Sequence, residues 1–390
     1  MLKNVASHIL DRCAQLQGMN IILGIGIGIN LLAIFQLLKG KNSKLISTKL
    51  AVLINVIWIV RLVLFLLKDS EIALKFPILL MLDQNLLLLD SVVLWLYSKS
   101  LLHTTKFKFK ILRNFLPFIV GLFLSISTYF SVPDELIVEQ FLKLKNDIAH
   151  NKSLFSIDVL VLFLVIITVS TVYFVKSIKE VKKFNSVLYN HFSSLKNISA
   201  NWILKFHSLW VSLFLIPIIL YFINYMYPVI NIGILLSFMI TIQVLFSFIF
   251  NSNVLSQIYV SIPKKGIIKQ DAKPTNEFKN ELDEIKKTLE IEKYYQDENL
   301  SLVKLSSYLN IKSVALTEII KYSEFENFYD LINTYRIESI KKELISSTEQ
   351  IMIIAYDNGF NSKSAFNRIF KEKTGQTPST FRNLNRNTSQ

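Results

Sequence analysis

Long apolar stretches fill the first two thirds of the chain and are almost absent from the last third. A membrane-spanning helix needs about 20 consecutive, mostly apolar residues. Stretches of this kind occur at seven places in residues 1–253, at 19–38, 50–67, 77–98, 112–132, 154–175, 203–226 and 229–250. Residues 254–390 read as ordinary water-soluble helical sequence. The pattern therefore predicts an all-α protein, in which a seven-helix transmembrane bundle at residues 1–253 precedes a soluble helical domain.

The lysines between the apolar stretches predict how the chain is oriented, because short cytoplasmic loops are rich in Lys and Arg. They follow the first, third and fifth stretches, at Lys39, Lys41, Lys44 and Lys49, at Lys99, Lys106, Lys108 and Lys110, and at Lys176, Lys179, Lys182, Lys183 and Lys196. The segments between them are acidic or mixed in charge. This alternation places the N-terminus outside and the C-terminal domain in the cytoplasm. For a bacterium, it predicts a multi-pass protein of the inner (cytoplasmic) membrane.

The charge of the chain is uneven, and most of it lies in the apolar part. The formal net charge is +14, but residues 254–390 contribute only +2, from 20 Lys and Arg against 18 Asp and Glu. The remaining +12 lies in residues 1–253. The basic pI of 9.5 therefore reflects membrane topology and is weak support for nucleic-acid binding by itself.

The residues that catalytic or metal sites require are sparse. Cys13 is the only cysteine, which excludes an internal disulfide and a cysteine-rich metal site. The five histidines are scattered, without His-Glu-x-x-His or another ligand spacing, and no phosphate-binding loop of the Walker type occurs. We therefore expect that the protein is not an enzyme and that it uses neither a metal nor a cofactor.

Four charged residues lie inside the apolar stretches, where a charge is costly to bury. They are Arg61 in the second stretch, Asp83 and Asp90 in the third, and Asp158 in the fifth. Arg61 and Asp83 lie about 9 Å from the outer ends of their helices, at about 1.5 Å per residue, which permits an ion pair between them. The four residues form either an intramembrane polar site that senses a ligand or ion, or a structural contact between helices.

Three glycines occur in the first apolar stretch, within GIGIGIN. No strand precedes them, which argues against a nucleotide-binding loop. Gly24 and Gly28 have the spacing of the small-residue motif that lets membrane helices approach closely. We expect these two glycines to mark a helix-packing face.

The soluble part begins with a linker and an amphipathic helix. Residues 254–276 contain prolines, a glycine and several lysines, which is typical of a linker. Residues 277–299 predict a helix whose apolar stripe consists of Phe278, Leu282, Ile285 and Leu289. This stripe either packs on its own domain or forms the seam of a homodimer.

Residues 300–390 predict two similar helical units that are joined by one long helix. The first unit has a helix at 302–309, a tight turn and a helix from about Ser313, and the long helix lies at 328–346. The second unit has a helix at 351–358, which Gly359 ends with a left-handed stop, and a helix from Ser362 to Lys373.

The last of these helices has an apolar face and a polar face. Phe366, Ile369 and Phe370 face the core, which leaves outward the side chains of Lys363, Ser364, Asn367, Arg368 and Lys371. A DNA-binding helix needs such a face, because donors read base edges and cations bind phosphates. A solvated charged face without a ligand has the same appearance, so the pattern alone leaves both interpretations open.

NGFNSKSAFNRIFKEKTGQTPSTFR, at 358–382, resembles the signature of the AraC-type (AraC/XylS) helix-turn-helix transcriptional regulators. The matching positions are Gly359, Phe360, Ser362, Ser364, Phe366, Arg368, Phe370, Lys371, Thr374, Gly375, Thr377 and Pro378. FYDLINTYRIE, at 328–338, resembles the helix that connects the two halves of such domains. The resemblance covers residues 300–382 and identifies 300–390 as an AraC-type DNA-binding domain.

The resemblance implies two helix-turn-helix units that enter successive major grooves of double-stranded DNA, about 34 Å apart. It implies DNA contacts by Thr317 of the first unit and, in the second, by Ser362, Lys363, Ser364, Asn367, Arg368 and Lys371. Val314, Ala315 and Glu318 differ from the residues that many family members carry on the first recognition helix. Because the carboxylate of Glu318 would repel phosphates, the second unit carries more of the predicted DNA binding.

The order of the domains is similar to that of the membrane-bound AraC-type regulators. We expect a membrane-embedded, sequence-specific transcription regulator, whose membrane part either couples a membrane or extracytoplasmic signal to operator binding or only anchors the domain. The expected partners are double-stranded DNA, the lipid bilayer, an unknown signal ligand, a second copy in a homodimer, and RNA polymerase if the protein is an activator. The alternative is a membrane transporter or receptor-like protein whose soluble tail does not bind DNA.

Overall fold

The computed structural model describes residues 2–68, 71–102, 109–149, 157–226, 232–257 and 276–387. Regular secondary structure in these ranges is helical, apart from one isolated bridge between Phe192 and Ser301. This confirms the predicted all-α fold class. The chain divides into two compact units, of which the first comprises 1–182 and 200–257, and the second 183–199 and 258–390. Each unit is described by itself.

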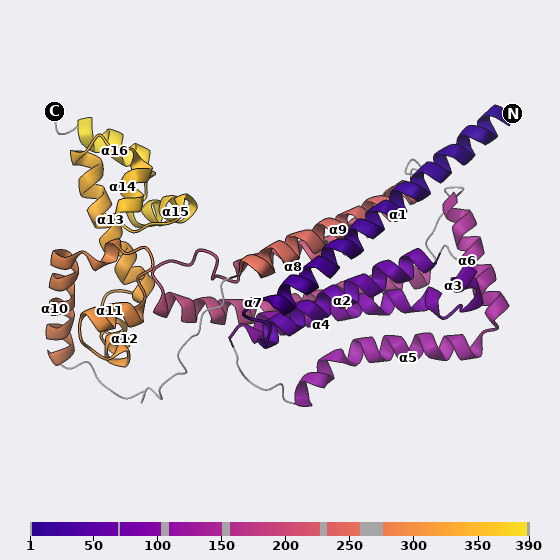
Figure 1. Cartoon of the computed structure of the whole chain (residues 1–390), viewed down its shortest axis with the longest axis horizontal. Helices are drawn as coiled ribbons and strands as arrows, with labels where there is room; N and C mark the ends of the chain where they lie inside the picture. Colours follow the sequence, from indigo (N-terminus) through magenta and orange to yellow (C-terminus); the bar gives the residue numbers. More distant parts are fainter. Residues whose placement is uncertain are drawn as a thin grey trace. The chain divides into compact units, whose positions relative to one another are not determined.

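The first unit is a set of long helices (Figure 1). They are α1 (Leu2–Lys39), α2 (Ile46–Leu67), α3 (Glu71–Lys75), α4 (Leu79–Ser100), the 3-10 helix η1 (Phe109–Phe115), α5 (Leu116–Ser131), α6 (Asp134–Ala149), α7 (Ile157–His191), α8 (Asn201–Met226) and α9 (Ile232–Ser256). The end of α7 belongs to the second unit. Each of the seven predicted apolar stretches overlaps one of these helices.

Three helices in the described part of the chain are long and apolar enough to cross a membrane: Met19–Lys39, Ile46–Leu67 and Ile111–Ser131. Ile240–Ser256 in α9 is a shorter apolar helix. These three helices overlap three of the seven predicted spans, and the other four predicted spans, which include residues outside the described ones, stay predictions.

The apolar helices expose much of their surface. None of the apolar window at Ile111–Ser131 is buried, and Phe123 and Phe130 are 68% and 81% exposed. Ile21 and Phe35 of α1 are exposed as well. Large apolar surfaces of this kind mark contact with a membrane or with another protein. They are consistent with a hydrocarbon environment around these helices.

α1 packs beside α2 and α9, and one glycine permits this close approach. A Cβ atom on Gly26 would lie 2.7 Å from Val244 Cγ2 and 3.0 Å from Leu62 Cδ1. The same atom on Gly24 or Gly28 would meet no atom of the described residues within 4 Å. Among the described residues, the glycine that packs on neighbouring helices is thus Gly26, which lies on the opposite side of α1 from Gly24 and Gly28.

Buried polar side chains connect the helices of the first unit. Asn55 of α2 and Asn251 of α9 exchange hydrogen bonds of 2.9 and 2.8 Å between their amides. Ser247 of α9 donates to the side-chain oxygen of Asn30 in α1 at 2.7 Å. Polar groups away from water need such partners, so these contacts fix how α9 packs on α1 and α2.

The second unit contains the helices that were predicted for the soluble part, together with a further C-terminal helix (Figure 1). They are α10 (Asn276–Glu292), the 3-10 helix η2 (Tyr294–Gln296), α11 (Leu302–Tyr308), α12 (Ser313–Lys321), α13 (Phe328–Ser346), α14 (Ile351–Asp357), α15 (Lys363–Thr374) and α16 (Pro378–Asn387). The predicted linker at 254–276 falls mostly on residues 258–275, which lie outside the described residues.

α13 is shared by two hydrophobic cores, and this explains why it holds the two halves together. The first half of α13 packs with α10, η2, α11 and α12. Its second half packs with α14 and α15. Leu282, Ile285 and Leu289 of α10 are buried in the first core. The apolar stripe of α10 therefore packs on its own domain, which leaves no need for a partner helix at these three positions.

The second unit also includes residues 183–199, which comprise the last turns of α7 and the chain after it. The backbone N–H of Ser193 donates to the carbonyl of Leu300 at 3.2 Å, and Phe192 forms the isolated bridge with Ser301. The sequence assigned this segment to the membrane part. The observed division therefore differs from the predicted boundary at residue 253.

Candidate nucleic-acid interface

α15 is fixed at both ends by its own sequence. The hydroxyl of Ser362 caps the helix by accepting from the N–H of Ala365 at 3.4 Å. Gly375 ends the helix in the left-handed conformation, with a φ of +74°. Phe366, Ile369 and Phe370 are buried in the second core, as the sequence predicted. The opposite face of α15 is therefore turned toward solvent.

The turn before α15 requires a glycine. Gly359 has a φ of +84°, in agreement with the predicted left-handed stop. A Cβ atom at this position would lie 2.6 Å from the carbonyl oxygen of Tyr295 and 2.8 Å from that of Gln296. Only a residue without a Cβ can approach these carbonyls so closely. Gly359 therefore sets the distance between the turn before α15 and the 3-10 helix η2.

The predicted DNA-binding residues of α15 lie together on its exposed face. Lys363, Ser364, Asn367, Arg368 and Lys371 are all exposed. Within the described part of the chain, Lys363, Asn367 and Lys371 have no hydrogen bond or ion pair with another side chain. Their two ammonium groups and one amide are free to contact a ligand. Ser362 lies at the same end of the helix, but its hydroxyl is used in the cap.

Arg368 is held by other residues of its own unit. Its Nη1 donates to Glu372 Oε2 at 3.0 Å, and its Nη2 donates to the Tyr329 hydroxyl at 3.0 Å. Burial raises the pKa of Tyr329, and the charge of Arg368 partly offsets this effect. Arg368 must therefore give up an ion pair and a hydrogen bond before its guanidinium can read a base edge, unlike Asn367.

The first helix-turn-helix unit offers fewer free groups. Thr317 of α12 is half-buried, and its hydroxyl donates to the carbonyl of Ser313 at 2.8 Å. Val314 is 52% exposed at the start of the same helix. Because the hydroxyl proton of Thr317 is already used, this side chain retains only acceptor capacity toward DNA. The larger role that the sequence predicted for the second helix-turn-helix unit stays a prediction.

Arg336 was not identified from the sequence, although its position in α13 is central. Its side chain is 1% exposed, and it donates to the carbonyls of Tyr295 and Asp297 at 2.7 and 2.8 Å. It also donates to Ser193, at 3.3 Å to the carbonyl and 3.1 Å to the hydroxyl. Burial lowers the pKa of Arg336 to about 10, so the guanidinium remains charged at neutral pH.

A hollow of about 580 Å³ opens beside the start of α15. It is lined by Lys196, Tyr356, Asn361, Ser362, Lys363, Ser364 and Asn367. Four of these residues were predicted to bind DNA, whereas Lys196, Tyr356 and Asn361 were not. The 52% exposure of Tyr356 on α14 is a signal that helix periodicity could have revealed. Nothing local in the sequence indicates Lys196, because it is brought here by the fold.

The first unit contains part of the predicted intramembrane polar site. Arg61 Nη1 donates to Asp90 Oδ2 at 2.7 Å, and Trp58 Nε1 donates to Asp90 Oδ1 at 3.2 Å. Arg61 also donates to the side-chain oxygen of Gln243 at 3.3 Å. The partner of Arg61 is thus Asp90. The side chains of Asp83 and Asp158 lie outside the described residues, so their predicted part in the site stays a prediction.

Comparison with known proteins places the similarity in the second unit. Residues 305–384 match the family described as "Helix-turn-helix domain". The chain is 40% identical over 85 residues to uncharacterized HTH-type transcriptional regulators of Staphylococcus aureus, including those of strains COL, MSSA476 and N315. The match covers 22% of this chain and 11% of the length of these relatives. The chain therefore spans only about a tenth of the length of these relatives.

Two solved structures are similar to this chain over a short part of its length. One is a protein of unknown function from Listeria innocua, with 28% identity, 29% of this chain covered, 98% of that chain covered and a TM-score of 0.23. The other is the C-terminal domain of AraT, a response regulator from Geobacillus stearothermophilus, with 23% identity, coverage of 29% and 88%, and a TM-score of 0.24. The family match and the relatives thus identify a helix-turn-helix domain within the C-terminal part of the chain.

Proposed function

We propose that this chain is a membrane-embedded transcription regulator that binds specific sites in double-stranded DNA through α15. The helix-turn-helix match at 305–384 is the observation that carries the DNA-binding part of the proposal. DNA recognition needs donors for base edges and cations for phosphates on one accessible face. α15 supplies Asn367 for the first role and Lys363 and Lys371 for the second.

The proposal assigns unequal roles to the two helix-turn-helix units. Asn367 of α15 is exposed and free of side-chain partners in the described part of the chain, which suits direct contact with an adenine edge. Thr317 of α12 has its hydroxyl proton committed to the backbone. We therefore assign base reading mainly to the second helix-turn-helix unit, and general positioning on DNA to the first helix-turn-helix unit.

A binding experiment with the full-length protein in lipid nanodiscs tests this assignment. Genomic fragments are first selected by the wild-type protein, and their affinity is then compared with that of random duplexes. Asn367→Ala should lower the affinity for selected fragments by about 1–3 kcal/mol and leave random duplexes almost unaffected. Lys363→Ala should weaken binding to both about equally, since a phosphate contact does not depend on sequence.

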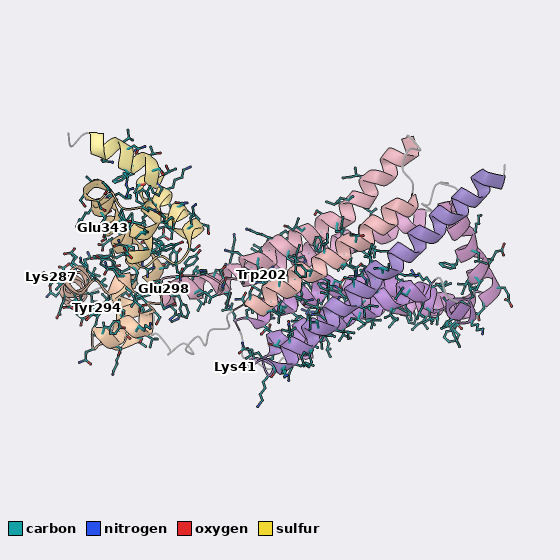
Figure 2. The ribbon with its side chains drawn as sticks, turned by 45° about the horizontal axis from the view of Figure 1, so that its top comes forward. Lys41, Trp202, Lys287, Tyr294, Glu298 and Glu343 are labelled. Carbon is teal, nitrogen blue, oxygen red and sulfur yellow. The ribbon has the colours of Figure 1, made fainter. Side chains whose placement is uncertain are left out.

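Lys287→Ala is the matched control. Lys287 is an exposed lysine of the same unit, on α10 and away from α15 (Figure 2). Its removal changes the charge by the same amount and should leave both affinities unchanged. The DNA-binding proposal fails if the wild-type protein shows no salt-dependent binding to any duplex, or if Lys287→Ala weakens binding as much as Lys363→Ala.

The membrane part of the proposal rests on the three apolar helices and on the exposed apolar surface of α5. We propose that the remaining helices of the first unit that overlap predicted stretches, which are α4, α7, α8 and α9, complete a seven-span bundle. The N-terminus then lies outside, and the C-terminal domain lies in the cytoplasm beside the chromosome. A reporter fused after Gln390 that is active only in the periplasm would refute this orientation.

The first unit is proposed to transmit a signal as well as to anchor the protein. The Arg61–Asp90 pair with Trp58 and Gln243 is closed by its own hydrogen bonds, which favours the structural interpretation of this polar cluster over a ligand site. The signal ligand is therefore proposed to act elsewhere in the bundle. A homodimer, and RNA polymerase as the partner of an activator, remain predictions from the sequence.

A further inference from the structure

The segment after α7 is held firmly on the second unit by a buried charge. Arg336 donates to both the carbonyl and the hydroxyl oxygen of Ser193, and the side-chain amide of Asn333 donates to the same carbonyl at 3.2 Å. The hydroxyl of Ser193 in turn donates to the carbonyl of Leu300 at 2.7 Å. Hydrogen bonds from a charged donor in a buried place are among the stronger ones in proteins. Residues 192–196, here called the docking segment, are thus fixed to α13.

The docking segment reaches the residue that precedes the cap of α15. The Ser194 hydroxyl donates to Asn361 Oδ1 at 2.9 Å, and Lys196 Nζ donates to the carbonyl of Asn361 at 2.9 Å. Asn361 is followed directly by Ser362, the capping residue of α15. Lys196 therefore lies at the end of α15 where the residues proposed to bind DNA begin.

The charge on Lys196 is not neutralised by the protein. Lys196 is exposed, and within the described residues its only partner is the neutral carbonyl of Asn361. It lines the same hollow as Lys363, so two lysines border one opening. A pair of cations without a carboxylate partner suits an anionic ligand, and the phosphates of DNA are the anions that α15 would meet.

We infer that the docking segment is part of the DNA-binding surface, and that Lys196 contacts a DNA phosphate beside the start of α15. The inference rests on the proposed function of α15 and extends it to a residue from the chain between α7 and α8. DNA affinity then depends on docking, because the contacts between Arg336 and Ser193 hold Lys196 at the proposed DNA-binding surface.

The alternative is that the docking segment inhibits DNA binding. For this, it would have to cover the exposed face of α15. Lys363 and Asn367 stay exposed although the docking segment is in place, and both line an open hollow with Lys196. The segment lies beside the proposed DNA-reading face and adds a cation to it. A phosphate contact is therefore favoured over inhibition, and the two predict opposite effects of removing Lys196.

The test measures DNA affinity against salt for the full-length protein in lipid nanodiscs, on a mixed-sequence duplex of about 40 base pairs, which spans successive major grooves. Lys196→Ala should reduce the slope of log affinity against log salt by about 0.9, the value of one released counterion. Lys196→Arg should restore the slope. Lys287→Ala, which removes an exposed lysine of α10 in the same unit (Figure 2), should leave it unchanged.

A second variant tests the dependence on docking without touching Lys196. Ser193→Pro removes the N–H that donates to Leu300 and should lower the slope as Lys196→Ala does. Adding Lys196→Ala to Ser193→Pro should then have no further effect, whereas independent sites would add. An unchanged slope for Lys196→Ala, or tighter binding of this variant, overturns the inference about Lys196. If the wild-type protein still binds DNA in that experiment, the proposed function of α15 is unaffected. A wild-type protein that binds no duplex overturns the proposed function itself.

Discussion

Replacing Gly359 by alanine should destabilise the second unit much more than the same replacement at Gly375. Both glycines have a positive φ, +84° and +74°, so an alanine at either position must adopt a left-handed backbone. This conformation costs about 1–2 kcal/mol for a residue with a Cβ. The two sites therefore share one cost, and their surroundings account for any difference.

The surroundings of the two glycines differ sharply. A Cβ at Gly375 would meet nothing within 4 Å, whereas at Gly359 it would lie 2.6 and 2.8 Å from the carbonyl oxygens of Tyr295 and Gln296. Backbone atoms cannot turn aside as the end of a side chain can, and forcing extra atoms into a packed place costs about 1–3 kcal/mol. We expect a loss of about 2–5 kcal/mol for Gly359→Ala and about 1–2 kcal/mol for Gly375→Ala.

Hydrogen exchange of the full-length protein in detergent can measure this difference. The four tryptophans, at 58, 95, 202 and 210, all lie in the first unit, so tryptophan fluorescence does not report on the second. The amides of α14 and α15 should exchange faster in Gly359→Ala, by about tenfold for every 1.4 kcal/mol lost, if exchange follows the opening equilibrium. Equal effects of the two replacements would show that contact with η2 does not set the turn, and the reasoning would fail.

Two further predictions concern the ion pairs. Arg368→Ala should lower affinity for the specific DNA site by about 1 kcal/mol or less, below the range for a direct base contact, because Tyr329 and Glu372 already hold its guanidinium. Glu372→Ala should raise the affinity, because it releases Arg368 from its ion pair. Anisotropy titrations in which Glu372→Ala bound DNA more weakly than Arg368→Ala would contradict this. In the first unit, Arg61→Met should destabilise by about 3–5 kcal/mol, whereas the double replacement with Asp90→Leu should cost much less, since it leaves no unpaired charge. Thermal unfolding followed by tryptophan fluorescence measures both variants, and equal losses would contradict the pairing.

The sequence predicts α15 well because its signals are local. Ser362 at the cap, Gly359 at the stop and the apolar residues of the helix all lie within a few turns of one another. The same local patterning predicts which side chains of α15 are exposed. It does not predict that Arg368 is held by Tyr329, because that partner lies 39 residues earlier and the contact depends on how α13 crosses α15.

Contacts between distant parts of the chain were harder to predict. Asp83 and Asp90 lie on the same face of one helix, so periodicity cannot decide which of them meets Arg61. The packing of α2 on α4 brings Asp90 to Arg61. Likewise, Ser193 lies 143 residues before Arg336, and no local pattern marks either as a partner of the other. Lys196 could be identified from the sequence only as a marker of a cytoplasmic loop.

Under the proposed function, a signal from the first unit would reach α15 through the docking segment. The chain crosses from one unit to the other at three places: within α7, after Ser199 and after Gln257. The first two of these crossings lie on either side of the docking segment in the sequence. A signal changes DNA binding only if it favours one of two states with different affinity for DNA. A released state of Ser193 would differ from the docked one in this way, because release would break the contacts of Ser194 and Lys196 with Asn361, next to the cap of α15. A displacement at the end of α7 must break the hydrogen bonds from Arg336 before the segment is released, so these bonds set the threshold that a signal has to exceed.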